Sequence, residues 1–331
     1  MGSMKNGDTQ VRRPPQPASD PSKNALLGLP TSTELRACWE LCRLHNNIGF
    51  WVVWLPTAWS IAMAYNARNN ITISEALLVA MLFVPLCFGI KSLIMTIDDI
   101  LDWDVDLLVT RTKTRPIPRG AISLKRAWLF FAIQVAIGVL LASQILDDTS
   151  IRIVTVVSPL YVIYPTCKRW MNFAPIPLGI MFNIGIFMGW SYLSPNTVAW
   201  DVLIPAYLGA CFWTCTYETV YQHQDKVDDT KINLHSPALY VGNATIPVCA
   251  VTGALFFTLM AYSGIRNEQG LFYFLSLAYA AYLLFRQLLK TNIDVPDECK
   301  AFFLLTTHIG RIILLGLIVD VGYRRHLMQV M

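Results

Sequence analysis

Two short segments of the chain concentrate its acidic residues. Residues 98–106 hold five and residues 218–229 hold four of the 22 acidic residues in the sequence. They are Asp98, Asp99, Asp102, Asp104, Asp106, Glu218, Asp225, Asp228 and Asp229. Carboxylates this close together repel one another unless cations lie between them. Mg²⁺ binds oxygen ligands and typically takes one or two carboxylates together with substrate phosphates. The two segments therefore predict a magnesium site, and a solvated acidic loop at a helix end is the alternative.

The spacing within each segment supports shared coordination. Asp99, Asp102 and Asp106 are three and four residues apart, so on a helix they project from one face. Asp225 and Asp229 are four residues apart and can hold a second ion in the same way. Each segment is expected to offer at least two carboxylates in one direction.

Basic residues alternate directly after the first acidic segment. Arg111, Lys113 and Arg115 follow it within nine residues. Guanidinium and ammonium groups donate hydrogen bonds to phosphate oxygens, so this run beside an acidic segment favours a diphosphate site. Charge that only orients the chain in a membrane is the alternative.

The segments must be positioned by membrane-spanning helices. The sequence is 54% hydrophobic and only 15% charged, whereas soluble domains carry about 25% charged residues. A spanning helix needs about 20 mostly apolar residues, and nine such stretches are present. They are 45–65, 74–97, 125–146, 150–167, 174–194, 200–222, 238–262, 270–289 and 301–321. The sequence predicts an all-α integral membrane protein with Asp-rich loops after spans 2 and 6.

The loops divide by charge. Those after spans 2, 4, 6 and 8 carry 13 basic residues, while the opposite loops carry only Arg68, Arg152 and Arg266. The positive-inside rule puts the even loops in the cytosol or matrix, so both acidic segments face the same compartment. Lys91 lies about two helical turns into the membrane from Asp98. It either reaches the diphosphate or extends to the interface.

The remaining features set limits. Residues 1–35 are polar and Pro-rich and are expected to be a disordered tail, with one transmembrane domain over 36–331. No basic run with interleaved aromatic residues indicates nucleic-acid binding. The eight cysteines are interpreted as buried thiols, and no obligate protein partner is indicated. A transporter would place its acids near the middle of the membrane, whereas these lie at helix ends.

The acidic segments resemble the two signatures of the UbiA prenyltransferase superfamily. The first signature is similar to Asp98-Asp99-x-x-Asp102-x-x-x-Asp106 followed by Arg111-Thr-Lys-Thr-Arg115-Pro116. The second is similar to Tyr221-x-His223-Gln224-Asp225-Lys226-x-Asp228-Asp229. Residues 164–169 and 294–299 match further family segments, and the resemblance covers roughly residues 40–320.

The resemblance implies nine transmembrane helices around a central cavity, two Mg²⁺ ions and prenyl transfer from a diphosphate to an aromatic acceptor, often phenolic. With the residue patterns, it gives three expected groups. The expected catalytic residues are Asp99, Asp102, Asp225 and Asp229. The expected diphosphate ligands are Lys91, Arg111, Arg115, Lys168 and Arg169. The expected metal ligands are Asp98, Asp99, Asp102, Asp106, Asp225, Asp228 and Asp229.

The expected reaction ionises the donor to an allylic cation in a cavity that excludes water. Aromatic side chains can stabilise such a cation. The candidates are Trp54, Trp59, Trp103, Tyr161 and Trp190. A terpene cyclase on the same fold would ionise the same donor without an acceptor, so that alternative stays open.

Three positions depart from the family pattern. Asp98 stands for the usual Asn, Glu218 for an Asp, and His235 for the Lys of many eukaryotic relatives. Within the superfamily, the second signature resembles the eukaryotic 4-hydroxybenzoate branch, which includes ubiquinone-pathway enzymes and fungal meroterpenoid enzymes. With these departures and no convincing transit peptide, the resemblance favours transfer of farnesyl or a similar group to a polyketide-derived phenolic acid in meroterpenoid secondary metabolism. The alternative is a 4-hydroxybenzoate polyprenyltransferase of ubiquinone biosynthesis. An endomembrane of the ER type is expected, with the mitochondrial inner membrane as the alternative.

Overall fold

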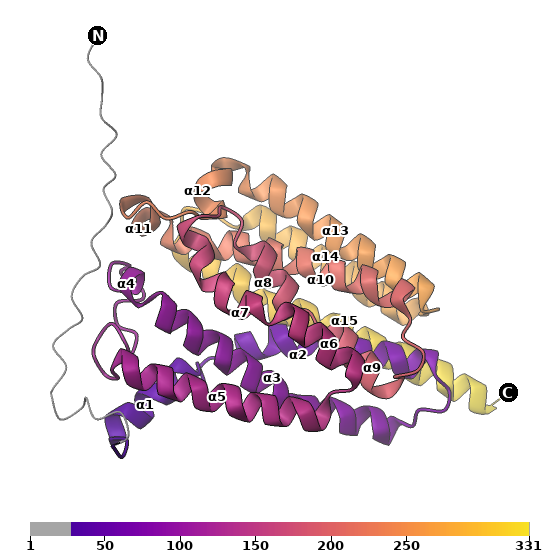
Figure 1. The fold of residues 1–331 in the computed structure, drawn as a ribbon. Helices are drawn as coiled ribbons and strands as arrows, with labels where there is room; N and C mark the ends of the chain where they lie inside the picture. Colours follow the sequence, from indigo (N-terminus) through magenta and orange to yellow (C-terminus); the bar gives the residue numbers. More distant parts are fainter. Residues whose placement is uncertain (1–27, 331) are drawn as a thin grey trace, which may run out of the picture.

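The computed structural model describes residues 28–330, with side chains placed through residue 327, and it is a bundle of helices without strands in that range. The long helices run alongside one another, and the chain runs back and forth along the bundle (Figure 1). The first half contains α1 (Ser32–Leu41), α2 (Ile48–Ala67), α3 (Ile73–Leu101), α4 (Trp103–Asp106), α5 (Leu124–Ile145), α6 (Asp148–Val157), α7 (Pro159–Ile163) and η2 (Tyr164–Arg169). The second half contains α8 (Pro175–Phe182), α9 (Gly185–Leu193), α10 (Trp200–Tyr221), η3 (Gln222–Asp225), α11 (Lys226–Lys231), α12 (Pro237–Val241), η4 (Gly242–Ala244), α13 (Thr245–Arg266), α14 (Leu271–Lys290) and α15 (Pro296–Val330).

Eight of the nine predicted spans coincide with helices that are long and apolar enough to cross a membrane. The remaining one, predicted at 200–222, is the 22-residue helix α10. It packs within the bundle against α13, α8 and α15, but it is not among those eight by composition. Asp201, Glu218 and several threonines lower its hydropathy. The chain is a multi-pass membrane protein. Eight of the nine predicted spans are confirmed, and the span predicted at 200–222 is not.

Local signals explain where the helices begin. Thr31 and Glu34 form a capping box at α1, and Thr72 and Glu75 form another at α3. Ser123 caps α5 through its side chain. These caps satisfy backbone N–H groups that have no partner inside the helix.

Two of the spans are interrupted. The fourth is α6, α7 and η2, which Pro159 and Pro165 divide. The fifth is broken between α8 and α9 at Asn183, whose Nδ2 donates to the Gly179 carbonyl at 2.7 Å and to Thr214 Oγ1 at 2.9 Å. The side chain thereby satisfies a carbonyl released by the break, as an interrupted helix inside a membrane requires.

The outer helices expose apolar side chains, as helices in contact with lipid do. On α5 only Ala127 is buried, while Ile133, Ile137, Val139 and Leu140 are exposed. The opposite situation holds for α2, where most residues are buried. The bundle therefore has a central layer around α2 and α10 and a lipid-facing outer layer.

Both acidic segments lie at one end of the bundle. Figure 1 shows α4 and α11 at the same end, away from the C-terminus. The predicted N-terminal tail falls mostly outside the described residues, and its last four positions, 32–35, form the first turn of α1. This helix packs through Ala37 and Leu41 into a small apolar cluster with α3 and α5. The chain continues from α1 into the loop that carries Arg43.

Candidate active site

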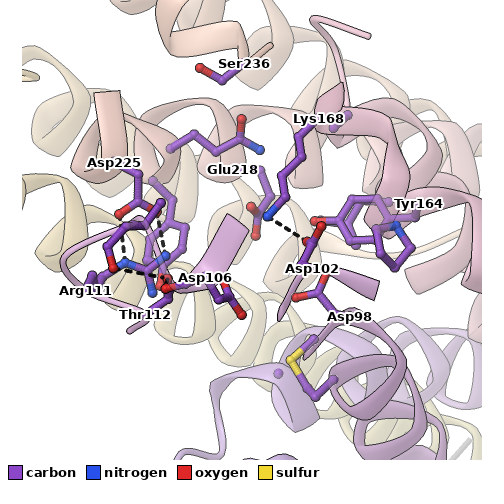
Figure 2. Close-up of a pocket in the computed structure, with 18 of the residues that line it drawn as sticks. Asp98, Asp102, Asp106, Arg111, Thr112, Tyr164, Lys168, Glu218, Asp225 and Ser236 are labelled. Carbon is purple, nitrogen blue, oxygen red and sulfur yellow. Dashed lines mark hydrogen bonds and ion pairs between the residues drawn. The ribbon is translucent and has the colours of Figure 1, made fainter. Parts of the chain in front are cut away.

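A cavity of about 440 Å³ opens at the end of the bundle that carries both acidic segments. Its acidic lining comes from both segments, as Figure 2 shows. The acidic residues are Asp98, Asp102, Asp106, Glu218, Asp225 and Asp229. The basic and histidine side chains are Arg43, His45, Lys91, Arg111, Arg115, Lys168 and His235. The structure thus brings together around one cavity most of the residues that the sequence analysis predicted to form the site.

The first acidic segment straddles the end of α3. Asp102 is the residue at which α3 ends, and its carboxylate pairs with Lys168 Nζ at 2.6 Å. Asp106 lies at the end of α4 and pairs with Arg115 Nη1 at 2.7 Å. Burial raises the pKa of the Asp102 carboxyl, and the Lys168 ammonium opposes that rise. Because Asp102 is only 2% exposed, its charge depends on this cation.

Asp99 lies behind the cavity wall rather than in it. Its side chain is fully buried and pairs with Arg43 Nη2 at 2.7 Å and with Arg115 Nη1 at 3.2 Å. Both arginines line the cavity, whereas Asp99 does not. The Asp99 carboxylate, which was expected to bind metal, therefore positions the guanidinium groups of Arg43 and Arg115 at the cavity wall.

The second acidic segment begins where α10 ends. Asp225 accepts two hydrogen bonds from Arg111, at 2.9 Å from Nε and 2.5 Å from Nη2. Asp229 also lines the cavity, and its side chain makes no hydrogen bond or ion pair with any of residues 28–327. Burial raises its pKa to about 6, and the neighbouring Asp225 charge adds to the effect.

Asp228 does not line the cavity, and its contacts join two loops. It accepts a hydrogen bond from the Thr110 backbone N–H at 2.9 Å and pairs with Lys231 at 3.0 Å. The Thr110 N–H holds the pKa of Asp228 below its ordinary value. Together with the Arg111–Asp225 pair, this contact connects the loop after α4 to the segment after α10.

Arg111, Arg115 and Lys168 pair with acidic residues of the cavity lining, whereas the other two expected diphosphate ligands bind mainly elsewhere. Arg169 pairs with Asp104 at 2.6 Å and donates to the Leu101 carbonyl at 3.2 Å, and it does not line the cavity. Lys91 does line it, but its Nζ donates to the carbonyls of Cys42 and Arg43 at 2.7 and 2.9 Å. Arg43 has a positive φ of 51°, which is uncommon for a residue with a side chain. Lys91 therefore anchors the loop that carries Arg43.

Several cavity residues were not singled out as site residues from the sequence. Arg43, Tyr164, Gln222 and Ser236 belong to this group. Glu218 was noted as one of the clustered acids and as a departure from the family pattern but was given no site role, yet it projects into the cavity between Asp225 and Asp102 in Figure 2. No pattern of spacing marks Arg43, because the contact that brings it here is made by Asp99, 56 residues later.

The cavity residues fit a bound Mg²⁺. In the described part of the chain, no three His, Cys, Asp or Glu side chains converge into a metal site made by protein alone. Mg²⁺ does not require one, because it usually takes one or two carboxylates and completes its shell with phosphates and water. Asp102 Oδ1 is buried and accepts no hydrogen bond, with only a 3.7 Å ion pair to Arg169. This oxygen and the Asp229 carboxylate are available to a cation.

The sequence matches a known family and named proteins. The model of the UbiA prenyltransferase family matches residues 53–309. The 4-hydroxybenzoate polyprenyltransferase, mitochondrial, of Schizosaccharomyces pombe is 32% identical over 290 residues, 85% of this chain and 78% of that protein. The 4-hydroxybenzoate geranyltransferase 2 of Lithospermum erythrorhizon is 31% identical over 323 residues, 96% of this chain and 98% of that protein.

Solved structures share the fold. A UbiA homologue from Aeropyrum pernix, solved in its apo form, has a TM-score of 0.67 at 22% identity, covering 82% of this chain and 97% of that one. A UbiA homologue from Archaeoglobus fulgidus, bound to GPP and Mg²⁺, has a TM-score of 0.62 at 16% identity and covers 86% and 99%. At these identities the likeness concerns the arrangement of helices.

Proposed function

Because the chain belongs to the UbiA prenyltransferase family, we propose that it transfers a prenyl group from an isoprenoid diphosphate to the ring of 4-hydroxybenzoate or a similar phenolic acid. The observation that carries the proposal is the single cavity lined by carboxylates of both acidic segments and by Arg111, Arg115 and Lys168. Such a lining suits a magnesium–diphosphate unit, which needs oxygen ligands on one side and cationic donors on the other.

The acidic residues divide into two roles. Asp102, Asp106, Asp225 and Asp229 line the cavity and would hold Mg²⁺, while Asp98 stands beside them in the same wall. When bound, Mg²⁺ supplies positive charge that stabilises the negative charge developing on the diphosphate. We assign Asp99 and Asp228 to positioning: the first holds Arg43 and Arg115, and the second holds the loop that carries Arg111.

The basic residues receive the leaving group. As the bond between the donor's C1 and its oxygen breaks, the electron pair stays on the diphosphate, whose oxygens face Arg111, Arg115 and Lys168. Donors that are already in place stabilise this charge without reorganising. The allylic cation that remains lies near Tyr221 and Phe303, whose rings line the cavity 4.3 Å apart and can stabilise it through their π faces.

The acceptor then completes the reaction. A ring carbon of the phenol forms the new carbon–carbon bond with the prenyl C1, and the same carbon loses its proton. Glu218 lines the cavity and makes no ion pair or hydrogen bond among residues 28–327, so its carboxylate can take that proton. Among the expected aromatic candidates, Trp54, Trp59, Trp103, Tyr161 and Trp190 all lie outside the cavity lining.

The relatives bear on the acceptor and the organelle. The names of both relatives described above specify 4-hydroxybenzoate, which favours the acceptor that the sequence analysis held as an alternative over a polyketide-derived acid. The mitochondrial name of the S. pombe protein, shared by the Homo sapiens relative, likewise favours the mitochondrial inner membrane over the expected ER-type membrane. We adopt both as parts of the proposal.

The proposal is tested with the full chain in yeast membranes. Membranes are incubated with 4-hydroxybenzoate, a prenyl diphosphate and Mg²⁺, and prenylated hydroxybenzoate and released diphosphate are measured. Both products are expected in equal amounts, to disappear with EDTA and to return with added Mg²⁺. Membranes carrying Asp201→Asn serve as a control, because Asp201 pairs with Arg266 away from the cavity.

Two results would overturn the proposal. Diphosphate release with a hydrocarbon or prenyl alcohol as sole product, unchanged by any phenolic acid, would indicate a terpene cyclase. Full activity in the presence of EDTA would remove the role of the carboxylates as metal ligands.

A further inference from the structure

Apolar side chains of α3 and α8 (Met95, Leu178 and Phe182) contribute to the cavity lining, as do those of three further helices, α2, α10 and α15. The latter three helices contribute Val52, Tyr221 and Phe303 to the lining. The prenyl tail of a donor whose diphosphate faces Arg111 and Lys168 must extend among such apolar side chains. What lies beneath these three residues therefore decides how far a tail can extend between α2, α10 and α15.

On each of the three helices, a residue two turns deeper on the same face meets the other two helices. Trp59 follows Val52 by seven residues, Gly310 follows Phe303 by seven, and Trp213 precedes Tyr221 by eight. Two turns amount to about 11 Å along a helix. Residues seven or eight apart lie on the same broad face of a helix, so each lies about two turns beneath its cavity residue.

These deeper residues converge at one point. A Cβ atom on Gly310 would lie 2.5 Å from Leu55 Cδ1 and 3.3 Å from the rings of both Trp213 and Trp59. Trp59 Nε1 donates to the Gly310 carbonyl at 2.9 Å, and the Trp59 and Trp213 rings are 5.3 Å apart. No space remains at this level for a hydrocarbon chain between α2, α10 and α15.

The layer between the cavity and this convergence is also filled. Tyr217 lies one turn beneath Tyr221 on α10, is 1% exposed, and contacts Phe303 and Trp213 at ring distances of 5.5 Å. Leu55 lies one turn beneath Val52 on α2 and is fully buried. An unbroken series of rings thus runs from Tyr221 through Phe303 and Tyr217 to Trp213.

A sideways route between α2 and α15 is bridged as well. Besides the Trp59–Gly310 hydrogen bond, the Arg311 guanidinium of α15 lies 4.0 Å from the centre of the Trp51 ring of α2. A guanidinium stacked on an aromatic face away from water is held more firmly than one in solvent. The seam between the two helices is therefore joined at two levels.

The geometry points to a tail-length limit set by two layers, Leu55 and Tyr217 above Trp59, Trp213 and Gly310, which restricts the donor to short prenyl diphosphates. The inference rests on the proposed prenyl transfer and adds the class of donor. A short tail that ends above the first layer leaves the buried side chains of both layers in place. A longer tail must displace buried rings, which interior packing resists.

The experiment compares donors of C10, C15, C20 and C45 with 4-hydroxybenzoate as acceptor. For the native chain, kcat/KM is expected to fall at least about 10-fold from C15 to C45, since a closed apolar pocket discriminates by roughly 10- to 200-fold per misfit. Leu55→Ala and Tyr217→Ala each open the first layer from a different helix. Both are expected to raise the ratio of kcat/KM for C20 over C10 about 10-fold.

Matched variants separate this effect from general damage. Tyr217→Phe keeps the ring and should leave the donor ratio unchanged. Tyr273→Ala removes an equally buried tyrosine between α13 and α14, where it donates to the Met260 carbonyl, and should lower stability without changing the ratio. A purely structural role for Leu55 and Tyr217 predicts an equal loss for every donor.

A binding measurement keeps the inference independent of turnover. Thermal stabilisation of the purified chain in detergent is recorded with Mg²⁺ and unreactive prenyl thiodiphosphates of the same lengths. The native chain should be stabilised by C10 and C15 analogues and much less by C45, and the two opening variants should accept C20. Equal stabilisation by C15 and C45, or equal turnover of both, would overturn the limit. Absence of product with every donor would instead contradict the proposed function.

Discussion

The two acidic segments face the same cavity but differ in how their charges are balanced. In residues 98–106, Asp99, Asp102 and Asp106 are almost completely buried, and each pairs with an arginine or lysine. In residues 218–229, Asp225 has one arginine partner, while Glu218 and Asp229 have no side-chain partner among residues 28–327. The first segment is a framework in which buried carboxylates are paired with cations, and the second includes two carboxylates, Glu218 and Asp229, without such a partner among residues 28–327.

The difference indicates separate duties. A buried carboxylate that loses its cation leaves an uncompensated charge and costs about 3–5 kcal/mol. Acids of the first segment therefore stabilise the fold as well as the site. Acids of the second segment can be changed without leaving a buried cation unpaired. Substitutions should consequently separate the two segments by their effects on stability as well as on activity.

The largest effects are expected from Asp102→Asn and Asp229→Asn. Both remove a carboxylate that faces the cavity, so kcat should fall at least about 100-fold in each, as for the loss of other charge-stabilising groups in enzymes. Only Asp102→Asn should also lower the melting temperature, because Lys168 then loses its partner. Product formation and thermal unfolding in detergent measure the two effects. Equal melting temperatures for both variants would remove the distinction between the segments.

Asp99→Asn should have the next largest effect. The variant weakens the hold on Arg43 and Arg115, and positioning groups around a metal site typically contribute 10- to 100-fold. The melting temperature should fall as well, since Asp99 is buried between two guanidinium groups. The Mg²⁺ concentration at half-maximal activity should remain nearly unchanged. A large increase in that concentration would instead make Asp99 a direct metal ligand.

The sequence was sufficient for the overall fold and for the location of the site. Apolar stretches of about 20 residues and the charge difference between loops predict eight spans that the structure confirms and one end for both acidic segments. These signals are local in the chain, and they survive folding because the membrane imposes them on every helix. Pro159 and Asn183 interrupt two of these spans.

The direction in which individual acids point was not accessible from the sequence. Asp98, Asp99 and Asp102 look equivalent in a motif, yet only Asp99 is turned behind the wall, because Arg43 reaches it from the loop after α1. That contact depends on Lys91, which fixes the loop through two backbone carbonyls. Contacts between residues 48 to 56 positions apart have no signature in residue spacing.

Lys91→Met tests whether the framework of the first segment extends into the membrane. The methionine keeps the apolar stem that packs against Gly49 but cannot donate to the carbonyls of Cys42 and Arg43. Activity is expected to fall about 10-fold, with a lower melting temperature, because Arg43 is no longer held. Lys91→Arg is the matched control, and partial recovery of both quantities is expected. If Lys91→Met lowered only the affinity for diphosphate and left the melting temperature unchanged, Lys91 would be a direct diphosphate ligand.

The smallest effect is expected from Asp228→Asn, although Asp228 belongs to the same motif as Asp225 and Asp229. Its carboxylate accepts from the Thr110 N–H and pairs with an exposed lysine, and a partly exposed ion pair contributes about 1 kcal/mol or less. An asparagine side-chain oxygen can still accept the Thr110 hydrogen bond, so the loop that carries Arg111 stays in place. Activity measured beside Asp229→Asn should therefore remain within about 3-fold of the native chain. A loss as large as that of Asp229→Asn would mean that Asp228 turns into the cavity when Mg²⁺ and diphosphate bind, and that the second segment supplies three carboxylates rather than two.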